Sequence, residues 1–182
     1  MNNIILIGFK SCGKTSVGTL LAQRLKLPFI DTDDLIVQRH LSNTGIGLNI
    51  ADMYRIRRDV YFRDVEKQVV RHMDTVQTTH VIATGGGSIV DAENRWRLKQ
   101  LGLVVHLSLS LDRLKTRIQA QPTSAIFEDD PGETRFMDLY TQRLPLYQQL
   151  ADIEFNTEDK SVAEVAAGLF SVIQPRLSAG LI

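Results

Sequence analysis

The stretch Gly8-Phe9-Lys10-Ser11-Cys12-Gly13-Lys14-Thr15 matches the P-loop pattern G-x-x-x-x-G-K-[ST] in full. It lies between an apolar run at residues 4–8, typical of a buried strand, and an amphipathic run at residues 14–26, typical of a helix. Glycines let the backbone of such a loop turn its N–H groups toward phosphate oxygens, at the positive end of the helix dipole. A glycine-rich turn without a ligand is the alternative, but this placement favours a nucleoside triphosphate site.

The side chains of the P-loop have separate expected roles. Lys14 is expected to reach the β- and γ-phosphates and to act in catalysis, and the Thr15 hydroxyl is expected to ligate Mg²⁺. Cys12 is the single cysteine of the chain, and no histidine lies near it in sequence. We therefore interpret it as a small filler rather than as a nucleophile. The residues expected to contact the nucleotide are Ser11, Cys12, Gly13, Lys14, Thr15 and Ser16.

Outside the P-loop, short apolar runs alternate with longer amphipathic ones. This alternation predicts a parallel sheet covered by helices on both faces, with right-handed crossovers, in a single domain of 182 residues. The longest expected helix, at residues 49–73, is predicted to break near residues 57–59. The expected strands are residues 4–8, 28–31, 81–84, 103–107 and 153–155, and the expected helices are 14–26, 33–40, 49–73, 91–101, 111–119 and one from about 161.

Two loops at the ends of the next strands complete the expected site, because ligands of such folds bind beyond the C-terminal strand ends. One is Asp31-Thr32-Asp33-Asp34 and the other is Gly85-Gly86-Gly87. One carboxylate can hold the water shell of a metal, and another can accept a hydrogen bond from a substrate hydroxyl and help take its proton. Alternatively, Asp33 or Asp34 caps the following helix, and both roles can coexist. The chain contains no Asn-Lys-x-Asp guanine-reading sequence, which argues against a GTPase.

Composition narrows the range of partners. The formal net charge is +0, so the chain as a whole is not attracted to nucleic acid or to an acidic membrane. The apolar run near the N-terminus lacks a basic start and is too short for a signal core or a membrane span. The four histidines show no metal-ligand spacing. We expect a cytoplasmic protein, a monomer, without nucleic-acid or membrane partners.

Later motifs, taken together with the P-loop, carry a resemblance to a known family. In order, the motifs are Gly8–Thr15, Asp31-Thr32-Asp33, Phe62-Arg63-x-x-Glu66, Thr84-Gly85-Gly86-Gly87 and Arg143-x-Pro145-Leu146-Tyr147. This set resembles shikimate kinase, a family in the nucleoside monophosphate kinase group of P-loop kinases, over nearly the whole chain. The resemblance implies a three-layer α/β sandwich whose five-stranded parallel sheet has the order 2-3-1-4-5. It also implies substrate-binding helices at about residues 33–73 and a mobile lid at about 120–134.

The activity implied by the resemblance is transfer of the γ-phosphate of ATP to the 3-hydroxyl of shikimate, with Mg²⁺, in the synthesis of aromatic amino acids. By the same resemblance, Asp33 holds the shikimate hydroxyls, and Asp31 lies near Mg²⁺ through water. Arg63 and Arg143 grip the shikimate carboxylate, and Gly86 offers its backbone N–H to the substrate. These residue types suit a small anionic polyol, because guanidinium groups bind carboxylates and a carboxylate accepts from hydroxyls.

Two other residues are expected to support these groups. Glu66 follows Arg63 by one helical turn, which is the spacing at which the two side chains can pair. Arg117 matches an arginine that packs near adenine in the family, so it is expected to contact the nucleotide.

The chain departs from the family pattern in two places. Where the family usually has Gly-Glu, this chain has Arg58-Asp59, which is expected to alter the angle between the substrate-binding helices. Where the lid of the family begins with Arg-Pro, this chain has Gln121-Pro122, so that Gln121 is the expected lid contact to the nucleotide. Glutamine cannot supply the positive charge that stabilises the transferred phosphate. Three explanations remain open. Another residue of the lid region, such as Arg135, moves to the phosphates in place of the missing arginine; the enzyme is slow; or the protein binds its ligands without turnover.

Two rival functions follow from these departures and from the site chemistry. A kinase of another small hydroxy acid, such as gluconate, would use the same pair of arginines. A nucleotide-binding module without turnover would explain the loss of the lid arginine, but such a module has no use for an acceptor site.

Overall fold

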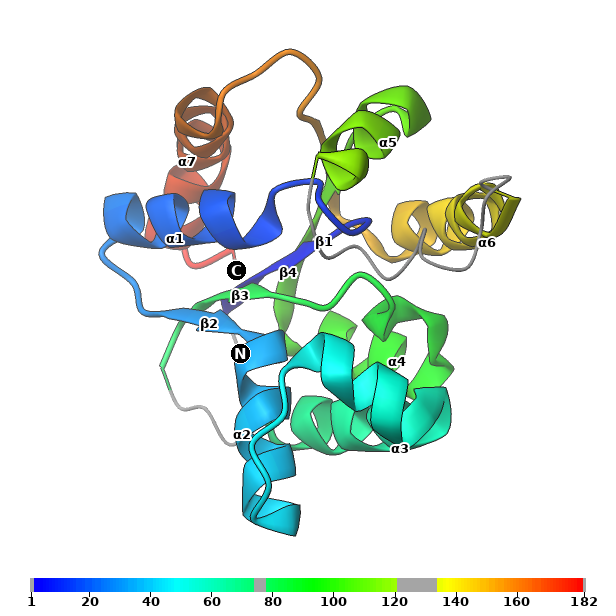
Figure 1. Cartoon of the computed structure of the whole chain (residues 1–182). Coiled ribbons are helices and arrows are strands. Elements are labelled where there is room, and N and C mark those ends of the chain that lie inside the picture. Colours follow the sequence, from blue (N-terminus) through cyan, green and yellow to red (C-terminus); the bar gives the residue numbers. More distant parts are fainter. Residues whose placement is uncertain (1, 74–77, 121–133, 182) are drawn as a thin grey trace.

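Five parallel strands form the central sheet of the chain: β1 (Asn3–Ile7), β2 (Phe29–Asp31), β3 (Val81–Ala83), β4 (Gly102–Ser108) and β5 (Ile153–Asn156). Their spatial order is β2-β3-β1-β4-β5 (Figure 1). The computed structural model describes residues 2–73, 78–120 and 134–181, except for the side chain of Arg58. The expected sheet, with its order 2-3-1-4-5, is confirmed.

Strand β1 lies in the middle of this sheet, paired with β3 on one side and with β4 on the other. All five of its residues are buried, as expected for a strand that has helices on both faces. Its central register aligns Ile5 with Ile82 and with Val104. The P-loop, which follows β1, is therefore held at the middle of the C-terminal edge of the sheet, where ligands of open α/β sheets bind.

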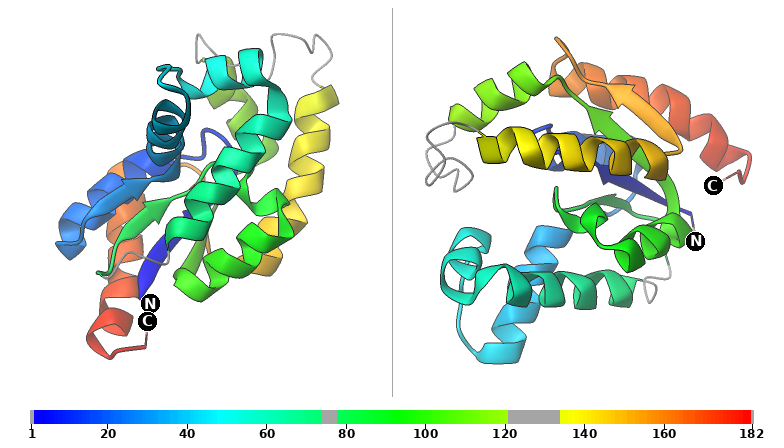
Figure 2. Two further views of the ribbon diagram at one scale, coloured as in Figure 1. Left: turned by 90° about the horizontal axis from the view of Figure 1, so that it is seen from below. Right: turned by 90° about the vertical axis from the view of Figure 1, so that its right-hand side faces the viewer.

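Helices cover both faces of the sheet and complete the three expected layers (Figures 1 and 2). On one face α1 (Lys14–Leu25) packs against α7 (Val162–Ser178), and on the other α4 (Ala92–Leu101) and α6 (Thr134–Leu150) contact β4. The buried core joins the strands to these helices in one apolar cluster. The other helices are α2 (Thr32–Thr44), α3 (Ile50–His72), the short 3-10 helix η2 (Ser88–Val90) and α5 (Leu111–Gln119).

Helices α2 and α3 pack together over residues 33–73, where the resemblance implies substrate-binding helices, and they have an apolar cluster of their own. His40 of α2 lies with its Nδ1 atom 2.7 Å from the hydroxyl of Tyr61 on α3, which ties the two helices together. Cluster members include Ile36 of α2 and Phe62 of α3. This second cluster fixes the position of the α3 side chains that face the sheet edge.

The break expected in α3 near residues 57–59 is wrong, because the helix runs without interruption from Ile50 to His72. The segment contains no glycine or proline, so charged side chains alone marked the expected break. Those charges support the helix instead: Arg63 Nε lies 3.4 Å from Asp59 Oδ1, one turn earlier. Asp59, one of the residues that departs from the family pattern, thus pairs with an expected substrate ligand.

Helix α6 has no counterpart among the elements expected from sequence. Pro145 lies inside it and cannot donate a backbone hydrogen bond, which argues against a helix at the level of sequence. Packing outweighs this cost, because Phe136, Tyr147 and Leu150 of α6 are buried against the core. The helix carries Arg143 to the edge of the sheet where the P-loop lies.

Candidate active site

The P-loop adopts a strained backbone that exposes N–H groups to a ligand. Gly8 has φ 146° and Gly13 has φ 103°, and Ser11 takes the left-handed region at φ 65° although it has a side chain. A Cβ atom at Gly8 would lie 2.7 Å from the carbonyl oxygen of Leu107, so this first glycine also allows the loop to pack against β4. The predicted P-loop is confirmed in its place between strand and helix.

The N-terminus of α1 is suited to an anion. Its N-cap is Gly13, with no side-chain cap found among the described residues and no acidic residue in the first turn. By contrast, α2, α3, α4, α5 and α7 all begin with side-chain caps and carry acidic residues in their first turns. The backbone N–H groups of α1 and its positive dipole end are thus left for phosphate.

Lys14 is buried at the first residue of α1, with its ammonium inside the P-loop. Its Nζ atom donates to the carbonyl oxygens of Gly8 and Phe9, both at 2.9 Å. Cys12 Sγ lies 3.7 Å from the same nitrogen and is buried. The loop therefore holds a positive charge in the place where the sequence predicted the phosphate-binding lysine.

Asp31 connects the end of β2 to the P-loop. Its Oδ2 atom accepts a hydrogen bond of 2.7 Å from the Thr15 hydroxyl, and its Oδ1 atom accepts one of 3.0 Å from the backbone N–H of Asp33. The second contact makes Asp31 the N-cap of α2, so the expectation that Asp33 or Asp34 caps this helix is wrong. Asp33 and Asp34 lie instead in the first turn.

The Thr15–Asp31 pair fits the needs of Mg²⁺. This cation usually keeps several waters and takes only one or two protein oxygens beside the phosphates of its substrate. The two oxygen atoms are 2.7 Å apart, next to the phosphate-binding helix end. Within residues 2–73, 78–120 and 134–181, no group of three His, Cys, Asp or Glu side chains could hold a metal ion by itself.

Asp33 is the carboxylate best placed to act on a proton. Burial, and next the negative charge of Asp31, raise the pKa of the Asp33 carboxyl to about 6. Lys14 lowers this pKa, whereas Glu66 and Asp34 raise it further. A pKa near the working pH suits a general base, because the group is ionised yet still accepts a proton.

Arg63 is held in place by Glu66, as the spacing in the sequence predicted. Arg63 Nη1 lies 2.7 Å from Glu66 Oε2, and the other oxygen of Glu66 accepts a 2.7 Å hydrogen bond from the Ser88 hydroxyl. Glu66 itself is buried, so removing its partners would leave an unpaired charge inside the protein. The guanidinium also lies over the rings of Tyr54 and Phe62, which limits its rotation.

The glycine loop at residues 85–87 brings the two expected arginines together. A Cβ atom at Gly87 would lie 2.5 Å from Arg63 Nη2, and Arg143 Nη1 lies 3.4 Å from the carbonyl oxygen of Gly86. A Cβ atom at Gly86 would lie 3.0 Å from the backbone nitrogen of Lys10. Gly86 therefore permits close approach of this loop to the P-loop, so the residues expected to bind the nucleotide and those expected to bind the acceptor meet here.

Tyr147 ends the last of the sequence motifs, which does not indicate what the residue does, and the structure places it under the glycine loop. Its hydroxyl donates to the carbonyl oxygen of Gly86, and its ring stacks on that of His106 at a centroid distance of 5.1 Å. Thr32 supports the same loop from the other side, since its hydroxyl accepts from the backbone N–H of Gly85 at 3.0 Å. Only contacts between distant segments reveal these two roles.

Tyr147→Phe should weaken binding of the acceptor more than it slows turnover. Loss of the hydroxyl leaves the partly buried Gly86 carbonyl with a poorer set of donors, so we expect about 1 kcal/mol of lost stability and a several-fold higher KM for the acceptor. Thermal denaturation and steady-state kinetics measure both effects. Tyr140→Phe, on the same helix, is the matched control. An unchanged melting temperature and KM would show that the hydroxyl does not position Gly86.

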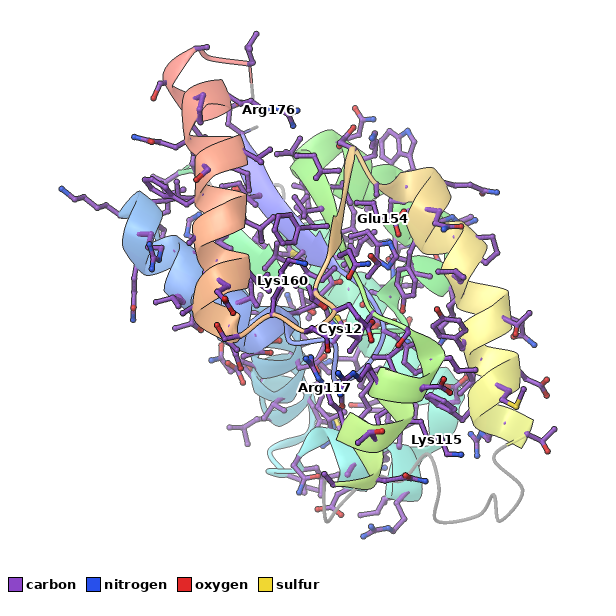
Figure 3. The ribbon with its side chains drawn as sticks, turned by 90° about the horizontal axis from the view of Figure 1, so that it is seen from above. Cys12, Lys115, Arg117, Glu154, Lys160 and Arg176 are labelled. Atoms are coloured by element: carbon purple, nitrogen blue, oxygen red, sulfur yellow. The ribbon has the colours of Figure 1, made fainter. Side chains whose placement is uncertain are left out.

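Arg117 lies at the outer side of the P-loop, near the end of α5 (Figure 3). Its Nη1 atom is 3.5 Å from the carbonyl oxygens of both Ser11 and Cys12. This position is compatible with the expected contact to the nucleotide. Gln121 and residues 121–133 of the expected lid lie outside the described residues, and Arg135 is exposed in the first turn of α6.

Comparison with known proteins agrees with this geometry. A sequence model of the shikimate kinase family matches residues 10–174 of the chain. The shikimate kinase of Thermodesulfovibrio yellowstonii is 34% identical over 180 residues, which cover 99% of each chain.

Solved structures extend the similarity to three dimensions. The shikimate kinase of Acinetobacter baumannii, solved in complex with shikimate, superposes with a TM-score of 0.84 and 30% identity, covering 97% of this chain and 94% of that one. A gluconokinase from Sinorhizobium meliloti superposes with a TM-score of 0.55 and 16% identity, covering 99% of this chain and 95% of that one. The second similarity concerns the fold alone.

Proposed function

The chain belongs to the shikimate kinase family, and from that premise we propose which of its residues bind ATP, which bind shikimate and which act in the transfer of the phosphoryl group. It is an ATP-dependent kinase. The observation that carries the proposal is the meeting of two sets of groups at one edge of the sheet. The P-loop with Lys14 lies on one side, and Asp33 with Arg63 lies on the other, joined by the contact between Gly86 and Lys10.

The donor side binds ATP through the P-loop and the start of α1. The backbone N–H groups between Ser11 and Ser16 face the phosphates. The Lys14 ammonium gives up its hydrogen bonds to the loop carbonyls and donates to the β- and γ-phosphates instead. Arg117 contacts the nucleotide from the outer side, where it already touches the loop backbone. Uncapped helix N–H groups and a buried cation both support this assignment.

Thr15 and Asp31 are the residues that would hold Mg²⁺. When bound, the ion neutralises part of the phosphate charge. The hydrogen bond between the two side chains supports this proposal, since it already brings two suitable oxygens together.

The acceptor side binds shikimate through its carboxylate and its hydroxyls. Arg63 and Arg143 bind the carboxylate, each held beside the glycine loop, and the N–H of Gly86 donates to the substrate. Asp33 accepts a hydrogen bond from the 3-hydroxyl and takes its proton as the phosphorus–oxygen bond forms. With a raised pKa of about 6, Asp33 is more basic than an ordinary aspartate and is still mostly ionised at neutral pH.

The described groups assigned to this site all come from one chain, and we propose that it works as a monomer, in one domain whose α2–α3 pair binds the acceptor. We place it in the cytoplasm, where ATP is available. None of the helices in the described residues is long and apolar enough to span a membrane.

A panel of acceptors tests this function and separates it from the gluconate alternative. With ATP and Mg²⁺, we expect ADP release with shikimate and at least about 100-fold lower kcat/KM with gluconate, because an open-chain acid does not place its hydroxyl at Asp33 when the arginines hold its carboxylate. A coupled assay of ADP formation measures this. Preference for gluconate, or ADP release independent of any acceptor, would overturn the assignment.

A further inference from the structure

Lys10 lies where the donor and acceptor sides meet. It is the third residue of the P-loop, and its backbone nitrogen is 3.0 Å from the position that a Cβ atom would take at Gly86. One residue earlier in the glycine loop, a Cβ atom at Gly85 would lie 3.0 Å from Asp33 Oδ1. Lys10, the glycine loop and Asp33 thus form a continuous strip between the phosphate site and the acceptor carboxylate.

The Lys10 side chain is half-buried and interacts electrostatically with Asp33. Burial lowers the pKa of its ammonium, and the Asp33 carboxylate acts in the opposite direction. Removing a cation partly from water is unfavourable unless a negative charge is near. The Asp33 carboxylate supplies that charge here, and an anionic phosphoryl group arriving at the same place would supply more.

Three other cations of the site, among the described residues, are engaged elsewhere. Lys14 contacts the carbonyl oxygens of its own loop, Arg63 pairs with Glu66, and Arg143 lies against the Gly86 carbonyl. In the proposed function these three bind the donor phosphates and the acceptor carboxylate. The space between them is where negative charge spreads over the transferred phosphoryl oxygens in the transition state.

Resting on the proposed function, we propose that Lys10 is a second cationic residue of the phosphoryl-transfer site, which stabilises the charge shared by the transferred phosphoryl group and the acceptor oxygen at Asp33. A lysine suits this place because its flexible stem can follow a point charge as the oxygen changes partners. The Lys10 ammonium keeps its proton throughout: the hydroxyl proton goes to Asp33, and the γ-phosphorus exchanges its bond to ADP for one to the acceptor oxygen.

The test compares Lys10→Met with Lys10→Arg and with the wild-type enzyme. We expect Lys10→Met to lower kcat by about 100-fold, the size of effect seen when one stabilising group is lost from a transition state. Lys10→Arg, which keeps the charge, should stay within about tenfold of the wild type, and the dissociation constant of shikimate, from calorimetry, should change little in either variant. Lys26→Met, at the far end of α1, is the exposed matched control.

The proposal would be overturned by wild-type kcat in Lys10→Met. It would be overturned equally by a loss confined to shikimate binding, or by Lys10→Arg as slow as Lys10→Met. Should Lys10→Met lower the melting temperature, Lys10→Gln provides the same loss of charge with a polar side chain. Failure of the proposed function itself is distinguishable, because the wild-type enzyme would then show no shikimate-dependent turnover.

Discussion

Asp33→Asn should reduce kcat by about a thousandfold while leaving the fold intact. The amide has nearly the same shape as the carboxylate but cannot take the proton of the acceptor hydroxyl, and general bases contribute roughly 10²–10⁴-fold to enzymatic rates. Wild-type kcat/KM should fall on the acid side of about pH 6, where Asp33 becomes protonated, and the residual activity of the variant should lack this limb. Steady-state rates between pH 5 and 9 measure both.

The same substitution should stabilise the protein at neutral pH. Because the folded-state pKa of Asp33 lies above its unfolded value of 3.8, the native state binds more protons than the unfolded state between about pH 4 and 6. Stability contributed by the neutral carboxyl is therefore present below pH 4 and lost as the pH rises through 6. Asp33→Asn should melt at a higher temperature than the wild type at pH 8, and the difference should shrink toward pH 4.

Asp34→Asn is the matched control for both measurements, since it changes the next residue in the first turn of α2. Its activity should stay near that of the wild type. If Asp33→Asn kept more than about a tenth of wild-type kcat, Asp33 would not be the base.

Lys14→Met is expected to have an effect of similar size, with kcat/KM for ATP lowered by about 10³-fold. The variant removes the charge that binds the β- and γ-phosphates, and preorganised charges of this kind are worth orders of magnitude in rate. It should fold normally, because the methionine stem fills the space of the lysine stem, and the lost contacts are those of the ammonium with the Gly8 and Phe9 carbonyls and with Cys12 Sγ.

Initial rates over a range of ATP concentrations measure this loss, and circular dichroism confirms the fold. Lys26→Met removes a lysine at the other end of α1 and should behave as the wild type. Comparable kcat/KM values in the Lys14 variant and this control would mean that Lys14 does not bind the transferred phosphate.

Local patterns were enough to predict the P-loop and its place between a strand and a helix. The P-loop glycines and Lys14 all lie within residues 8–14, so their spacing alone specifies the turn and the helix start that follows. The pairing of Arg63 with Glu66 was also predictable, because both lie on one helix. The order of the strands came from the family resemblance, since period and length do not say which parallel strands are neighbours.

What sequence reasoning missed depends on contacts between distant segments. Nothing near Tyr147 indicates that its hydroxyl reaches Gly86, which lies in another loop, and nothing near Lys10 indicates its approach to Asp33. The helix that carries Tyr147 was itself missed, because Pro145 argues against a helix until burial of its neighbours is known. The cap of α2 was assigned two or three residues too late, at Asp33 or Asp34 instead of Asp31, since all three are suitable residue types.

The measurement that tests the central claim most directly is the balance of products with ATP, Mg²⁺ and shikimate at pH 8. We predict that each ADP formed is matched by one shikimate phosphorylated at its 3-hydroxyl. Phosphorus NMR measures the phosphorylated shikimate, and a coupled assay measures ADP in the same sample. ADP without a phosphorylated acceptor, or no shikimate-dependent ADP at saturating substrates, would contradict the account.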